Sequence, residues 1–369
     1  MRGRHTPAPP GGTPGLQCQK AISLSLGEFI LVSIIKIVIA LGVLLTAVAY
    51  TVWLERKVVG HIQNRWGPTR VGPFGLLQPL ADGVKFIFKE DLLPPHVFKP
   101  LYIAAPMIAL IFALTSISVI PVGNWITVFG IHTPLEITDV NIGLLIVLGV
   151  TSLGVYGVAL AGWSSNSKYS LLGGLRASAQ MVSYEISLGL SLVGVLILAG
   201  SFSLRDIVDA QSGTFWGFIP RWNIFQGQII AFFIYLMAAY AETNRVPFDL
   251  PEAETELVAG YHTEYSAMKF AMFFMAEYAN MITVACLATL LFLGGWHGPH
   301  RFGPPFLQAI LPVFWFVAKI FAFLFLYIWV RGTLPRFRYD QLMAFGWKFL
   351  LPLAIANLVI TALIVALRA

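Results

Sequence analysis

The chain has 369 residues, of which 57% are hydrophobic and only 11% are charged, and its formal net charge is +6 at pH 7. Its mean hydropathy is +0.76, whereas a soluble domain has about 25% charged residues. These values exclude a water-soluble globule and predict a protein that uses lipid as the solvent for much of its surface.

Residues 1–24 are rich in Pro and Gly, and we expect them to form a disordered tail. The two cysteines, Cys18 and Cys286, form no C-x-x-C pair, which argues against a disulfide framework or an iron–sulfur cluster. The sequence also lacks the G-x-G-x-x-G and P-loop patterns of nucleotide sites. We therefore expect this chain to bind no metal, redox centre or nucleotide of its own.

Apolar runs long enough to cross a bilayer follow the tail, and about 20 residues are needed for each crossing. We count eight, at residues 25–54, 101–121, 141–162, 180–200, 226–242, 268–293, 306–330 and 347–367. They lack the alternation of barrel strands, so they are predicted to be helices. The predicted fold class is an all-α polytopic membrane protein, with one transmembrane domain over residues 25–369, eight transmembrane helices and short amphipathic helices in its cytoplasmic loops.

The distribution of Lys and Arg predicts the orientation of these spans. Segments after odd-numbered spans carry 15 of these residues and the other side carries seven, while Lys36 and Lys319 fall inside spans. The cytoplasmic loops, or matrix loops in an organelle, are therefore predicted at residues 55–100, 163–179, 243–268 and 331–346. Both termini are predicted on the opposite side.

The first loop is the longest, and its Gly/Pro-rich part, "GPTRVGPFG", is not predicted to be helical. The stretch that follows, residues 76–89, has Leu76, Leu80, Val84 and Phe88 at intervals of four. This spacing predicts an amphipathic helix that lies at the membrane interface.

The third cytoplasmic loop gathers much of the scarce negative charge of the chain. Asp249 and Glu252 have the spacing of a helix cap and capping box, so we expect them mainly to hold the loop. Glu254 and Glu256 lie deeper in the same short predicted helix. Crowded carboxylates raise one another's proton affinity, so such a group could relay protons. The alternative for these residues is a solvated acidic face.

Carboxylates also occur in or near the predicted spans. Glu277 lies inside the sixth span, and Glu185 is placed at the start of the fourth. Glu136 and Asp139 lie near the outer start of the third span. A charged group within a span marks an ion or proton route by default, although Glu185 could also be an ordinary helix-end group.

Four long segments together resemble one family, the NuoH-type membrane subunit of respiratory complex I (NADH-quinone oxidoreductase), known in mitochondria as subunit 1 of NADH dehydrogenase. The segments are "LERKVVGHIQNRWGPTRVGPFGLLQPLADGVKFIFKE", "GWSSNSKYSLLGGLRASAQMVSYE", "AETNRVPFDLPEAETELVAGYHTEY" and "PRFRYDQLM". The resemblance covers about residues 28–367. Thr69 and His61 depart from the family pattern in the first loop.

The resemblance implies a protein that frames a quinone entrance and carries an acidic path for protons. The residues that match the entrance are Arg56, Arg65, Asp82, Phe270, Phe273 and Phe274. The residues that match the acidic path are Glu242, Asp249, Glu252, Glu254, Glu256, Glu264 and Glu277, with Arg245 beside them and Glu185 added as a further candidate.

The family also implies the partners. They are the hydrophilic quinone-site subunits and small membrane subunits of complex I, with quinone as substrate, flavin and iron–sulfur clusters in other subunits, and no nucleic acid. The expected location is the cytoplasmic membrane of a bacterium, or the mitochondrial inner membrane. An equivalent component of a membrane-bound hydrogenase or formate-linked complex is the main alternative. A stand-alone transporter would show inverted internal repeats, and the acidic cluster has no counterpart in residues 1–180.

Overall fold

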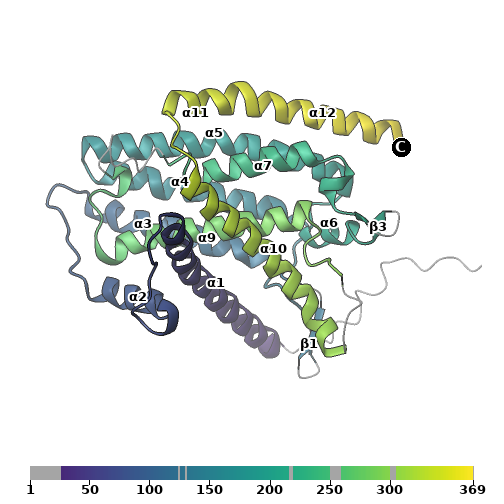
Figure 1. Ribbon diagram of the computed structural model, residues 1–369, viewed down its shortest axis with the longest axis horizontal. Coiled ribbons are helices and arrows are strands. Elements are labelled where there is room, and N and C mark those ends of the chain that lie inside the picture. Colours follow the sequence, from purple (N-terminus) through teal and green to yellow (C-terminus); the bar gives the residue numbers. More distant parts are fainter. Residues whose placement is uncertain are drawn as a thin grey trace, which may run out of the picture.

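The computed structural model describes residues 26–123, 125–128, 131–215, 219–249, 259–299 and 305–368. Helices make up most of this part of the chain, and its strands form two antiparallel two-stranded sheets (Figure 1). The predicted all-α membrane class is confirmed.

The elements are as follows in chain order. The longer helices are α1 (Leu26–Ile62), α3 (Lys99–Thr115), α4 (Gly143–Ser164), α5 (Lys168–Ala199), α7 (Ile229–Glu242), α9 (Ala267–Phe292), α10 (Pro305–Thr333) and α12 (Leu351–Arg368). The shorter helices are α2 (Gln78–Phe88), α6 (Leu204–Ala210) and α11 (Tyr339–Phe345). Single 3-10 turns are η2 (Pro73–Gly75), η3 (Ser116–Val119), η4 (Asn223–Gln226) and η5 (Gly260–His262), and η6 (Gly346–Leu350) is a π-helical turn. Strand β1 (Trp125–Val128) pairs with β2 (Ile131–Pro134), and β3 (Thr214–Phe215) pairs with β4 (Ile219–Pro220).

Seven helical segments in the described ranges are long and apolar enough to cross a membrane. The helix α7 has only 14 residues, which corresponds to a length of about 21 Å against the roughly 30 Å of a hydrocarbon core. The seven segments and α7 correspond to the eight predicted spans. The count of eight is not confirmed, because α7 falls short of the length criterion, and it stays a prediction.

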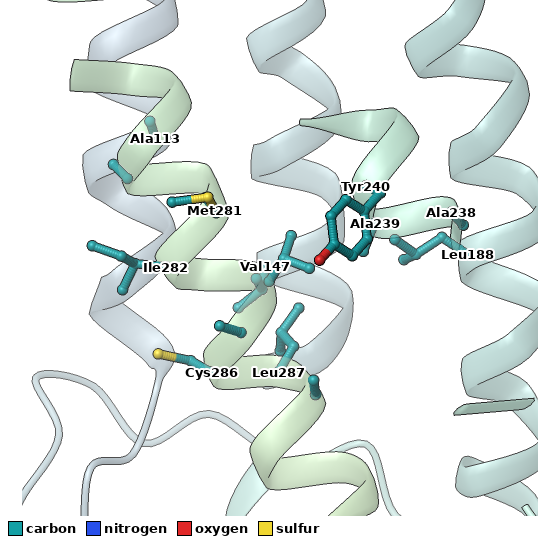
Figure 2. Close-up of a cluster of buried hydrophobic side chains, with 14 of the residues drawn as sticks. Ala113, Val147, Leu188, Ala238, Ala239, Tyr240, Met281, Ile282, Cys286 and Leu287 are labelled. Carbon is teal, nitrogen blue, oxygen red and sulfur yellow. The ribbon is translucent and has the colours of Figure 1, made fainter. Parts of the chain in front are cut away.

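The core lies where α3, α4, α5, α7 and α9 meet. Figure 2 shows Met281, Ile282 and Leu287 of α9 beside side chains from the neighbouring helices. In α9, 67% of the most apolar stretch is buried, whereas the corresponding value for α1 is 6%. The helix α9 is therefore the central helix, and α1 lies at the periphery (Figure 1).

The helix α5 begins at Lys168, well before the start predicted near residue 180. The prediction placed residues 163–179 in a loop because the segment is polar. This segment contains the adjacent glycines Gly173 and Gly174. In the structure those glycines are packing positions, since a Cβ at Gly173 would lie 2.7 Å from the Cα of Gly260, and a Cβ at Gly174 would lie 3.0 Å from the Cα of Gly162. The polar segment therefore continues the helix, because its small residues let two other backbones approach.

The predicted amphipathic helix of the first loop is confirmed as α2. Before it, residues 63–72 are not helical, and α1 continues through Ile62 into the segment predicted as loop. The helix α2 lies beside one end of α1 and apart from the main bundle (Figure 1).

The two lysines inside predicted spans bond to backbone carbonyls. The Nζ of Lys36 donates to the carbonyl oxygens of Pro134 and Glu136, each at 3.1 Å. The Nζ of Lys319 donates to three carbonyls beyond the end of α9, those of residues 293, 295 and 297, at 2.7 to 2.8 Å. Each lysine therefore ties a loop to a helix.

Candidate functional site

A buried carboxylate near the C-terminal end of α1 anchors the site. Glu55 is 8% exposed, and Oε2 accepts a 2.6 Å hydrogen bond from the hydroxyl of Tyr278 in α9. Its other oxygen, Oε1, contacts the guanidinium of Arg331 in α10. Arg245, in the turn after α7, lies 3.9 Å from Oε2 of Glu55. One carboxylate therefore joins three helices and the turn that leads into the acidic segment, and its charge is compensated, as a buried ion requires.

Arg245 lies between two carboxylates. Besides its approach to Glu55, its Nη2 lies 3.7 Å from Oε2 of Glu277, and its guanidinium lies over the ring of Tyr278 at 4.1 Å. The other oxygen of Glu277 accepts a 2.8 Å hydrogen bond from the hydroxyl of Tyr261. Arg245 thus lies beside Glu277, one of the acidic residues that the resemblance implied. A buried cation between two carboxylates couples their charges, so a change at one affects the other.

A small cavity of about 30 Å³ lies next to this group and is lined by both Glu242 and Glu277. Among the described residues, the side-chain oxygen of Asn280 is buried and has no hydrogen-bond partner, and Asn280 also lines the cavity. A cavity of this size exceeds the volume needed for a water molecule, and its polar lining supplies partners for one. The space can therefore hold water between two acidic side chains.

Asp249 lies at the end of the turn that follows α7, four residues after Arg245. It is 6% exposed, and its Oδ2 lies 3.1 Å from Nη2 of Arg336, in the segment after α10. Burial raises the pKa of the Asp249 carboxyl to about 6, although the Arg336 guanidinium acts in the opposite direction. Stacking of Phe248 on Phe337, with ring centroids 5.7 Å apart, holds the same two segments together. The structure thus gives Asp249 a partner that the sequence analysis did not identify.

The turn between Glu242 and Asp249 is held by one buried amide, that of Gln180 in α5. Its Nε2 approaches the carbonyl oxygens of Ala241 and Phe248, each at 2.8 Å, and Oδ1 of Asn244 at 3.1 Å. Three acceptors around one amide nitrogen define its orientation, because the amide oxygen in that place would face only other acceptors. Gln180 therefore positions the chain between two of the predicted acidic residues.

The predicted entrance residues separate into two groups. Arg56 forms a 2.7 Å ion pair with Asp82 of α2. Arg65 is exposed and donates from Nε to Oε1 of Gln63 at 2.8 Å. Arg56 thus lies in the last turns of α1 and is tied to α2, whereas Arg65 lies in the loop after α1.

The three phenylalanines lie on α9, but they do not share one face. Phe270 and Phe274 have ring centroids 4.6 Å apart, and Phe270 faces Phe86 of α2 at 6.4 Å. Phe273 is buried against Tyr261 and lines the acidic cavity instead. The structure thus brings Phe270 into contact with α2, with Phe274 beside it on α9, whereas Phe273 lines the cavity.

Two other predicted acidic residues have separate surroundings. Glu185 lies in the middle of α5, which corrects its predicted place at a helix start, and it accepts a hydrogen bond from the Ser152 hydroxyl. The carboxylate of Glu264 lies 3.9 Å from Nε2 of His96, while its backbone carbonyl accepts from the Tyr102 hydroxyl at 2.6 Å. The remaining three, Glu252, Glu254 and Glu256, lie outside the described residues, and so does the capping box predicted for Asp249 and Glu252.

Sequence analysis missed Glu55, Tyr278, Arg331 and Arg336 as site residues. Glu55 stood next to a matched residue, and the two arginines were counted only as positive loop charge. A carboxylate directly after a long apolar run was the available signal for Glu55. Nothing local in the sequence indicated its partners Tyr278 and Arg331, which lie more than 200 positions away.

Comparison with known proteins gives a consistent result over nearly the whole chain. The family model described as NADH dehydrogenase matches residues 35–362. The H subunit (number 2) of the NADH-quinone oxidoreductase of Koribacter versatilis (strain Ellin345) is 74% identical over 356 residues, which cover 93% of this chain and 99% of the relative. The H subunit (number 1) of the same enzyme from Solibacter usitatus (strain Ellin6076) is 52% identical over 394 residues, covering 92% of this chain and 98% of the relative. The H subunit (number 2) from Geobacter metallireducens is 50% identical over 346 residues, covering 90% and 95%.

Proposed function

The chain belongs to the NADH dehydrogenase family, in which its relatives are the H subunits of NADH-quinone oxidoreductase, membrane components of complex I, and on this premise we propose two roles for its sites. The aromatic side chains where α2 meets α9 form part of the quinone-binding chamber. The buried carboxylates around Arg245 couple quinone reduction to proton translocation.

The side chains at the contact between α2 and α9 support the first role. Apolar surface comes from Phe86 of α2 and from Phe270 and Phe274 of α9. The ion pair of Arg56 with Asp82 involves α2 as well, and Asp82 lies one turn before Phe86. Burial lowers the pKa of His262, which packs against Phe270 at 5.4 Å, although the Glu277 carboxylate acts against this shift. An apolar wall with a few polar groups suits a quinone headgroup on an isoprenoid tail.

The single observation that carries the second role is the continuity of the buried charges. The contacts run from Glu55 through Arg245 to Glu277, and from Glu277 across the cavity to Glu242. Reduction of a quinone takes up two electrons and two protons, which changes the charge at the site where it occurs. Carboxylates that share one buried cation respond together to such a change, and water in the cavity would carry the proton between them.

The wider assignments are part of this proposal. The chain would adjoin the hydrophilic quinone-site subunits through its first loop and the small membrane subunits through its lipid-facing helices. Flavin and iron–sulfur clusters would be held by partner subunits. The location would be the cytoplasmic membrane of a bacterium. The names of the similar relatives favour this enzyme over a hydrogenase or formate-linked complex.

The test is photo-crosslinking in the assembled complex with a light-activated inhibitor that competes with quinone. We expect labelled peptides to come from α2 and from the first two turns of α9, and excess quinone should prevent the labelling. Labelling confined to other subunits, or to segments far from α2 and α9, would exclude the proposed chamber.

A further inference from the structure

The helix α2 is attached to the rest of the chain by few packing contacts. It contains no buried residue, and its apolar side chains Leu80, Ile87 and Phe88 are each at least two-thirds exposed. The apolar stripe of a surface helix normally fixes its position by packing against a core. In α2, Phe86 is half-buried and packs on Phe270 of α9, and most of the remaining apolar stripe is uncovered within this chain.

Polar contacts also hold α2. On the side facing α1, the ion pair of Arg56 and Asp82 is partly exposed, with 49% and 18% of the two side chains accessible. An exposed pair of this kind contributes little to stability. This pair also joins α2 to α1 and not to α9, so the place of α2 relative to α9 depends on the packing of Phe86 on Phe270 and on a further attachment.

That attachment lies directly after the C-terminal end of α2. Oδ2 of Asp91 is 2.8 Å from Nζ of Lys269 in α9, and the backbone N–H of Leu92 donates to Oγ of Ser266 at 3.1 Å. We call these four residues the linker clasp. It joins the end of α2 to the first turn of α9, the turn that also carries Phe270.

In the α9 half of the linker clasp, the side chain of Lys269 is packed against an aromatic ring. The side chain of Lys269 is only 12% exposed, and its ammonium lies 5.2 Å from the centre of the Tyr102 ring. Tyr102 in turn stacks on Tyr265 with ring centroids 4.1 Å apart. Lys269 therefore offers Asp91 a charge whose place is set by two packed rings. The Asp91 side chain is 47% exposed and belongs to the linker.

We propose that the linker clasp positions α2 against α9 and so sets the separation of Phe86 and Phe270, which makes Asp91 and Lys269 positioning residues for quinone binding. The positioning of α2 stands on the contacts described above, whereas the link to quinone rests on the proposed function. With the linker clasp broken, α2 would have to be ordered each time a long-tailed quinone binds. The apparent affinity for quinone is then the intrinsic affinity multiplied by the fraction of molecules in which α2 is already in place.

The experiment uses the complete complex in its native membrane and compares Asp91→Asn with the wild type. Glu90→Gln is the matched control, because it removes the same charge from the neighbouring exposed residue, for which the described contacts give no ion pair. Asp91→Glu keeps the charge and should behave as the wild type. Two quantities are measured: hydrogen exchange of the peptide covering residues 76–98, and KM and kcat for a long-tailed and a short-tailed quinone.

We expect Asp91→Asn to speed exchange in that peptide and to raise the KM for the long-tailed quinone by about fivefold, the upper range for a partly exposed pair. The value of kcat and the KM for the short-tailed quinone should not change. Unchanged exchange would overturn the role of the linker clasp, whatever the kinetics. Faster exchange with unchanged KM values would instead place quinone entry elsewhere and overturn the proposed chamber together with the positioning role. A fall in kcat for both quinones, with KM unchanged, would also overturn the positioning role.

Discussion

The hydroxyl of Tyr278 donates a 2.6 Å hydrogen bond to Glu55 across 223 residues of sequence. The bond connects the central helix α9 to the peripheral helix α1, and it holds the Glu55 carboxylate within reach of Arg245. Tyr278 is also the ring over which the Arg245 guanidinium lies. One tyrosine thus orients both the anion and the cation of the buried group, which makes the group a single electrostatic unit.

Replacement of Glu277 tests the proposed coupling. Glu277→Gln removes the charge that faces Arg245 but keeps an oxygen that can accept from Tyr261. Because Arg245 still faces Glu55, the complex should assemble with normal yield. We expect quinone reduction and proton pumping to fall together by about tenfold, which corresponds to 1.4 kcal/mol on the barrier. Both rates are measured in membrane vesicles. Glu90→Gln, on the exposed linker, serves as the control, and normal pumping by Glu277→Gln would remove Glu277 from the path.

Glu254 and Glu256 provide a second test, which depends on the sequence alone because both lie outside the described residues. The double variant Glu254→Gln plus Glu256→Gln should assemble but should show reduced quinone reduction and reduced pumping. Glu→Gln preserves shape while removing the titrating proton. The amount of complex is measured by native gel electrophoresis alongside both rates. A variant whose defect is confined to assembly would contradict a coupling role.

Asp249 should contribute to stability in a pH-dependent way. Its pKa in the folded chain is about 6, against an ordinary value of 3.8, so between these values the folded state holds a proton that the unfolded state has released. The contribution of this group to stability therefore falls by about 3 kcal/mol as the pH rises from 4 to 6, and it stays constant above that.

The measurement is thermal inactivation of the solubilised complex across this pH range. Asp249→Asn cannot titrate, so its stability relative to the wild type should increase from pH 4 to 6 and then level off. Asp340→Asn, at an exposed position, should show no such trend. Asp249→Ala removes the group that faces Arg336 and should lower the amount of assembled complex. A flat difference between Asp249→Asn and the wild type would contradict the raised pKa.

Arg65 is predicted to act on quinone without a structural role. Its described contact within the chain is an exposed hydrogen bond to Gln63, so Arg65→Ala should leave assembly intact. We expect the KM for quinone to rise about tenfold, the loss expected for one hydrogen bond to a charged group. Electron transfer from NADH to a water-soluble acceptor should be unchanged. Arg70→Ala, at another exposed position in the same loop, is the control, and equal loss of both activities by Arg65→Ala would indicate failed assembly.

The number of membrane crossings can be decided by labelling single cysteines in a Cys18→Ser background. Glu90→Cys and Ser212→Cys should react from opposite sides of the membrane, with Glu90→Cys on the cytoplasmic side. Asp340→Cys then reports on α7, because α7, α9 and α10 separate position 212 from position 340. If α7 crosses, positions 90 and 340 share a side. If it does not, position 340 lies on the side of position 212, and the predicted count of eight is wrong.

The sequence predicted features that depend on periodicity and composition. The helix α2 follows from the four-residue spacing of Leu80 and Val84, and the spans follow from uninterrupted apolar runs. The start of α5 was wrong because local polarity suggested a loop, whereas Gly173 and Gly174 act through backbones that are distant in sequence.

The site was predicted in part for the same reason. Glu242, Arg245 and Glu277 could be named as a group because charge in an apolar sequence is conspicuous. Their mutual arrangement could not be predicted, since the contact of Arg331 with Glu55 joins residues 276 positions apart. Phe273 was assigned to the entrance because it lies in an aromatic run, but one helical residue turns through about 100° relative to the next. Its ring therefore faces the cavity, while Phe274 lies beside Phe270.

The contact between Gly173 and Gly260 has a mechanical consequence. At this contact no side chain lies between the backbones of α5 and η5. A change of rotamer therefore cannot absorb a relative displacement of the two backbones there. A shift of α5 along its axis would be transmitted to η5, whose Tyr261 holds Glu277 through its hydroxyl. A single added methyl group at position 173 would therefore push these two backbones apart. It would shift Tyr261 and the Glu277 carboxylate without altering any charge.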